Sequence, residues 1–131
     1  MNHTMKDIKS KDDIADAMEI TANLARKCGC SYPQTLKLQL VTEEACMNAY
    51  EYCQEQTHSS FQICWSFRNK KFEIVVRQTG GTITLLQKND VNVGLRGRGL
   101  TLILSLLDQV EVRKVNQFVE LYMMKEIGEQ Q

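Results

Sequence analysis

The feature that most constrains the fold is a pair of neighbouring segments in which apolar and polar residues alternate. The apolar positions of the two segments are Phe61, Ile63, Trp65 and Phe67, then Phe72, Ile74 and Val76. Alternation with a period of two is typical of strands that bury one face. Because only the polar residues 69–71 separate the segments, they predict an antiparallel hairpin.

Further strands are predicted at both ends of the chain. Residues 109–113 and 118–125 read as a second hairpin, and residues 4–9 as a short edge strand. The sheet is therefore expected to hold five strands in all.

Two helices are predicted before the first hairpin and one after it. Ser10 and Asp13 resemble the start of a capped helix that runs to about residue 27, where Gly29 suits a left-handed turn. Pro33 favours the first turn of a second helix, which runs to about Cys53. A third apolar helical segment spans residues 99–107. Together these elements predict an α+β, two-layer sandwich: a mixed, mainly antiparallel sheet with the helices on one face.

Composition narrows the class of protein. The 131 residues suit one domain, residues 1–131, with one sizeable core. Sixteen basic and sixteen acidic residues cancel, so nothing in the overall charge favours a nucleic acid or an anionic membrane as partner. Five cysteines without a CxxC motif, with no secretory signal or membrane-length apolar run, predict a reduced cytoplasmic protein with free thiols.

Polar residues that suit chemistry occur within the second predicted helix. Glu44 and Asn48 are four residues apart and therefore share a helical face. The same row runs back through Leu40 and Leu36, so we expect it to line the edge of the core or a pocket. An amide oxygen is a ligand for a hard cation such as Mg²⁺, and a carboxylate is a candidate general base. The alternative is that both side chains face solvent or cap a loop.

Two glycine-containing segments follow. Gly80 and Gly81 come directly after a predicted strand, where glycine allows a ligand to approach the backbone, although an ordinary turn is the alternative. Residues 94–100 lead into a helix and carry Arg96 and Arg98. Amide groups at a helix start, with two guanidinium groups, suit a phosphate. The alternative here is a flexible connection.

Taken in order, these segments resemble the nucleotide-binding motifs of the GHKL ATPases, above all the small bacterial anti-sigma-factor serine/threonine kinases. Residues 41–49 (VTEEACMNA) are similar to the first motif, and residues 96–112 (RGRGLTLILSLLDQVEV) to the glycine-rich one. The likeness extends over nearly the whole chain and includes the order of the elements.

The resemblance implies a Bergerat-type, histidine-kinase-like ATPase fold that binds ATP and Mg²⁺. It implies that Asn48 ligates the Mg²⁺ and that Glu44 is the base that accepts a proton from the attacking hydroxyl. It also implies that Gln78 and Gly80 lie at the adenine. The phosphates would be met by Arg96, Gly97, Arg98, Gly99 and Leu100. By the same resemblance, the partners are a sigma factor and an anti-sigma antagonist protein, and the chain forms a homodimer.

The adenine motif departs from the family pattern D-x-G-x-G. Gln78 replaces the aspartate, and Thr82 replaces the second glycine. A neutral amide in place of a carboxylate weakens the hydrogen bond by on the order of 1–2 kcal/mol, about tenfold in affinity. Tyr52, one turn after Asn48, also occupies a position that resembles one at which the family has histidine.

The leading hypothesis is an anti-sigma-factor-like regulator that binds Mg-ATP and phosphorylates a serine on an antagonist protein. The alternative is a nucleotide-free, non-catalytic sequestering module of the same fold, which the changes at Gln78 and Thr82 suggest. The nucleotide-binding part of a split sensor kinase and an unrelated α+β domain are further alternatives.

Overall fold

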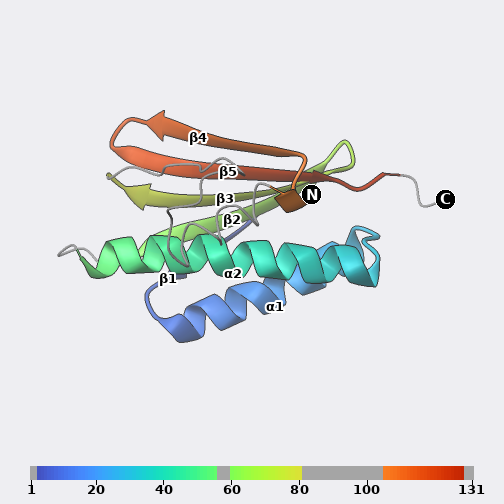
Figure 1. Cartoon of the computed structure of the whole chain (residues 1–131), viewed down its shortest axis with the longest axis horizontal. Helices are drawn as coiled ribbons and strands as arrows, with labels where there is room; N and C mark the ends of the chain where they lie inside the picture. Colours follow the sequence, from blue (N-terminus) through green and yellow to red (C-terminus); the bar gives the residue numbers. More distant parts are fainter. Residues whose placement is uncertain (1–2, 56–59, 81–104, 129–131) are drawn as a thin grey trace.

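The computed structural model describes residues 3–55, 60–80 and 105–128 of the chain. Its elements in chain order are β1 (His3–Ile8), α1 (Lys11–Lys27), α2 (Tyr32–Gln54), β2 (Phe61–Arg68), β3 (Lys71–Thr79), β4 (Gln109–Val115) and β5 (Phe118–Glu126). Both helices pack on one face of the sheet, which gives two layers (Figure 1). The predicted α+β sandwich is confirmed.

The five strands lie in the order β1-β2-β3-β5-β4, so that β1 and β4 are the edges. A mixed, mainly antiparallel sheet was predicted, and all four pairings of the described strands are antiparallel. The β2–β3 turn is one residue shorter than predicted, because Lys71 already belongs to β3. Asn69 and Lys70 adopt φ angles of 52° and 63°, the left-handed conformation that a two-residue turn of matching twist requires.

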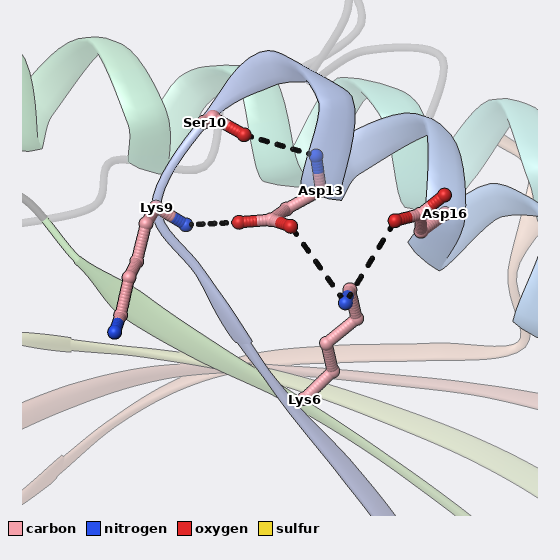
Figure 2. Close-up of polar contacts among 5 residues, drawn as sticks. All are labelled: Lys6, Lys9, Ser10, Asp13 and Asp16. Atoms are coloured by element: carbon pink, nitrogen blue, oxygen red, sulfur yellow. Dashed lines mark hydrogen bonds and ion pairs between the residues drawn. The ribbon is translucent and has the colours of Figure 1, made fainter.

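A polar cluster joins β1 to the start of α1 (Figure 2). The backbone N–H of Asp13 donates to Ser10 Oγ at the N-cap, as the sequence predicted. The Asp13 carboxylate accepts from the backbone N–H of Lys9 at 2.8 Å, and Lys6 Nζ lies 3.7 Å from it and 4.0 Å from Asp16. The hydrogen bond from Lys9, with the charge of Lys6, lowers the pKa of Asp13. These contacts hold the edge strand against the helix layer.

The connection between α1 and α2 is set by backbone hydrogen bonds. Gly29, at φ 91°, donates to Arg26 O while Cys30 donates to Ala25 O, which is the Schellman pattern. The next helix begins with a full capping box, in which Ser31 and Gln34 bond each other's backbone N–H groups. Because both ends are capped close together, α1 and α2 lie antiparallel and side by side (Figure 1).

The core lies between the helices and the inner face of the sheet. Its largest fully buried side chains come from all layers: Trp65, Phe72, Ile8, Leu38, Ile63, Ile74, Met123, Val41 and Val76. A buried polar chain crosses it, in which Trp65 Nε1–H donates to Thr21 Oγ1 at 2.8 Å. Thr21 Oγ1 lies 2.8 Å from Thr42 Oγ1, which bonds to Leu38 O. These bonds satisfy the indole N–H and tie α1, α2 and β2 together.

One prediction about the buried side of α2 is wrong, and the third predicted helix is described only in part. Leu36 and Leu40 were expected at the edge of the core or a pocket, but both are exposed on α2. The core row of that helix runs instead through Leu38, Val41 and Ala45, on the side that faces the sheet. Of the third predicted helix, only its last residues are described, and Leu106 packs against the core.

Candidate functional site

Helix α2 carries Glu44 and Asn48 one turn apart, about 6 Å along the helix axis. Both side chains are half-buried, between the buried core row and the exposed side of the helix. The Nδ2 atom of Asn48 itself is buried from solvent. Glu44 and Asn48 therefore lie at the edge of the core, although Leu36 and Leu40 on the same row are exposed.

The environment of Glu44 suits a proton acceptor. Burial raises the pKa of its carboxyl, and the negative charges of Glu43 and Glu51 raise it further. A carboxylate with a raised pKa holds a transferred proton more firmly than a solvated one.

Strand β3 brings a second part of the candidate site to the helix layer. Its inward positions are Phe72, Ile74, Val76 and Gln78, because side chains alternate along a strand. Gln78 is 3% exposed, and its Nε2 donates to the carbonyl oxygen of Gly80 at 3.1 Å. The inward row of β3 is therefore apolar except at its last position, where Gln78 places a polar amide.

Gly80 connects this strand end with α2. It adopts a φ of 73°, and its N–H donates to Gln117 O at 2.8 Å. A Cβ atom at Gly80 would lie 3.7 Å from the Tyr52 hydroxyl oxygen. Tyr52 is the next residue after Glu44 and Asn48 on the same four-residue row. The row therefore leads from the candidate base directly to the end of β3.

The other predicted site residues lie outside the described residues. These are Arg96, Gly97, Arg98, Gly99 and Leu100, together with Thr82. The structure places Tyr52 of α2 beside Gly80, whose carbonyl accepts from Gln78. Glu44 and Asn48 precede Tyr52 on the same row of α2.

Comparison with known proteins identifies the family. The family model of the histidine kinase-like ATPase domain matches residues 9–125. The chain belongs to this family. The GHKL resemblance drawn from the motifs is confirmed, and the fold is that of a histidine kinase-like ATPase. No curated protein matches the chain.

Several solved structures share the fold. A chain of the SiaB–SiaC complex from Pseudomonas aeruginosa is 12% identical, with a TM-score of 0.65 over 92% of this chain and 88% of that one. The catalytic domain of histidine kinase ThkA is 13% identical, with a TM-score of 0.56 over 95% and 96%. Histidine kinase AdeS from Acinetobacter baumannii is 10% identical, with a TM-score of 0.55 over 98% and 69%.

Sequence reasoning missed the internal bond of Gln78 and the approach of Tyr52 to Gly80. The signal for the second was present, because Tyr52 continues the row of Asn48 and a glycine follows β3. The donor chemistry of Asn48 fits the family's cation, because an amide oxygen is a hard ligand of the kind that Mg²⁺ prefers. None of the helices in the described ranges is long and apolar enough to cross a membrane.

Proposed function

We propose that this chain is a regulator of the anti-sigma-factor type that binds Mg-ATP and phosphorylates a serine of an antagonist protein. The observation that carries the proposal is the row of Glu44, Asn48 and Tyr52 on α2, whose last member lies beside Gly80 at the end of β3. Glu44 as a general base and Asn48 as a cation ligand are parts that a phosphoryl-transfer site needs. The amide of Gln78 lies on strand β3.

Each residue has one part in binding. Asn48 would hold Mg²⁺ through its amide oxygen, which is a hard ligand. Gln78 would accept a hydrogen bond from the adenine amino group through Oε1, because its Nε2 already donates to Gly80 O. The glycine-rich residues 96–100 would meet the phosphates, as the family resemblance implies.

The proposed transfer follows from the position and pKa of Glu44. The serine oxygen forms a bond to the γ-phosphorus of ATP while the bond between that phosphorus and the β,γ-bridging oxygen breaks. ADP leaves with the electron pair of that bond. The serine proton passes to the Glu44 carboxylate, whose pKa burial raises. The products are a phosphoserine and ADP.

The proposed partners are a sigma factor and an antagonist protein. One of the similar structures is a chain of a complex of two proteins, SiaB and SiaC, which supports a regulator that works through protein contacts. We also propose a cytoplasmic, single-domain homodimer, and the five free thiols accord with a reducing compartment.

A second candidate function is a nucleotide-free module that sequesters its partner. The burial of Gln78 favours it, because a neutral amide that is 3% exposed stands where the family has an aspartate. In this function Glu44 and Asn48 would have no role in chemistry.

Calorimetric titration with ATP, with and without Mg²⁺, distinguishes the two. We expect Mg²⁺-dependent binding that Asn48→Ala abolishes and that Gln54→Ala, at an exposed site on the same helix, leaves intact. Circular dichroism should show both variants folded. Absence of binding at millimolar ATP would overturn the kinase and leave the sequestering module.

A further inference from the structure

Helix α2 exposes three large apolar side chains along one row. Tyr32 is 75% exposed, Leu36 41% and Leu40 45%. They stand four residues apart, so they form one continuous ridge, the α2 apolar ridge (Tyr32, Leu36 and Leu40). Among the described residues, only Met5 and Val115 are also large, apolar and exposed, and both lie on strands.

The fold itself does not need this ridge. The buried side of α2 is supplied by Thr35, Leu38, Val41, Thr42, Ala45, Cys46, Ala49 and Cys53. Exposed apolar side chains that are grouped on a helix whose buried side is already complete are typical of an interaction surface.

The α2 apolar ridge continues into the candidate site. The next two positions of the same four-residue row are Glu44 and Asn48, and each step along the row is about 6 Å. A segment bound along the ridge would therefore reach Glu44 within one helical turn of Leu40. This continuity indicates that the occupant of the ridge is the protein whose hydroxyl Glu44 serves.

Basic residues near the ridge indicate which charge its partner would carry. Arg26 and Lys27 end α1 beside the start of α2, and Lys37 lies on α2 between Leu36 and Leu40. All three side chains are exposed. The end of the ridge remote from Glu44 is thus bordered by positive charge, which favours acidic residues in a partner.

We propose that the α2 apolar ridge is the docking surface for the protein substrate. It binds an amphipathic helix with apolar residues at four-residue intervals and acidic residues at the end near Tyr32. The hydroxyl to be phosphorylated lies about one turn beyond the last apolar contact, at Glu44. This inference rests on the proposed function and adds to it the partner's binding mode.

Synthetic peptides of about 18 residues, five helical turns, serve as probes. The first carries leucines at four-residue intervals, a serine one turn beyond the last leucine, and glutamates at the opposite end. In the second the leucines are scrambled, and in the third lysines replace the glutamates. Fluorescence anisotropy of labelled peptides measures docking without ATP, and transfer of labelled phosphate from ATP measures chemistry.

We expect the first peptide to bind at least about tenfold more tightly than either of the others. The double substitution Leu36→Gln/Leu40→Gln should remove this preference, while ATP binding stays unchanged. Val115→Gln makes the same change at an exposed apolar residue on the sheet and should have no effect. Lys37→Glu should weaken binding of the glutamate peptide and favour the lysine peptide.

The outcomes separate the two proposals. Equal binding of all three peptides by a protein that binds ATP would overturn the docking surface and leave the proposed function. Selective binding of the first peptide without any ATP binding would overturn the kinase and keep the docking surface. A wild-type dimer that the double substitution dissociates, seen by light scattering, would assign the ridge to a second copy and overturn the inference.

Discussion

The hydroxyl oxygen of Tyr52 stands 3.7 Å from the place that a Cβ atom would take at Gly80. The C-terminal part of α2 therefore lies beside the residue that follows β3, a glycine without a side chain. The same glycine accepts the hydrogen bond from Gln78. The side chains of Tyr52 and Gln78 therefore lie beside the backbone of Gly80 at the end of β3. This junction is the proposed adenine end of the site.

Gly80→Ala tests the junction. The φ of 73° is unfavourable for any residue with a Cβ atom, so we expect a loss of about 1–2 kcal/mol in the free energy of unfolding. Contact with Tyr52 adds little, because 3.7 Å is an ordinary van der Waals distance. Urea denaturation measures the change, with Gly128→Ala as the control, since a Cβ atom there meets nothing within 4 Å. Equal stability of the two variants would contradict the assigned backbone conformation.

Gln78→Asp tests the adenine contact. An aspartate is shorter and charged, and it restores the acceptor that the family uses, so we expect ATP to bind about tenfold more tightly. Thr79→Asp is the matched control, because the neighbouring side chain points to the other face of the sheet. Calorimetry of both variants measures the affinities. No gain in Gln78→Asp would show that the amide is not at the adenine.

Glu44→Gln tests the proposed base. The variant keeps the shape of the side chain but cannot accept the serine proton, so we expect phosphate transfer to fall by at least about a hundredfold. ATP binding should be retained, since Asn48 and Gln78 are unchanged. In the wild type, the transfer rate should rise with pH through the raised pKa of Glu44, with a midpoint above 4.5. A rate that is independent of pH in this range, in a folded protein, would remove Glu44 from that role.

The same substitution has an expected effect on stability. The pKa of Glu44 is raised in the folded protein by burial and by Glu43 and Glu51, so its ionised form disfavours folding. Wild-type stability should therefore decrease as pH rises from 4.5 through the folded-state pKa, relative to Glu44→Gln. Urea denaturation at pH 4 and pH 7 should show that the variant gains stability over the wild type only at the higher pH. A constant difference would contradict the raised pKa.

Thr21→Val tests the buried polar chain. Valine has the same shape as threonine but leaves the indole N–H of Trp65 without its acceptor, at a cost of about 1–3 kcal/mol. The cost should shrink in a Trp65→Phe background, where no indole N–H remains to be satisfied. A double-mutant cycle by urea denaturation measures this coupling. Additive effects would mean that the hydrogen bond contributes little.

Local patterns predicted most of the architecture. The alternation from Phe61 to Val76 located β2 and β3, and Ser10 and Pro33 located the starts of both helices to within one residue. These signals succeed because they depend on neighbours within one or two turns of chain. Leu36 and Leu40 were misjudged because apolar character alone does not tell which side of a helix faces the sheet.

The sequence by itself determined the helices, the hairpins and the shared face of Glu44 and Asn48, because helical and strand periodicity are local properties. Only the tertiary structure decided that β5 lies between β3 and β4, that Tyr52 meets Gly80, and that Gln78 turns its amide to Gly80 O. Those relations depend on how α2 packs across the sheet. Packing joins residues far apart in the chain, and no spacing within one segment records it.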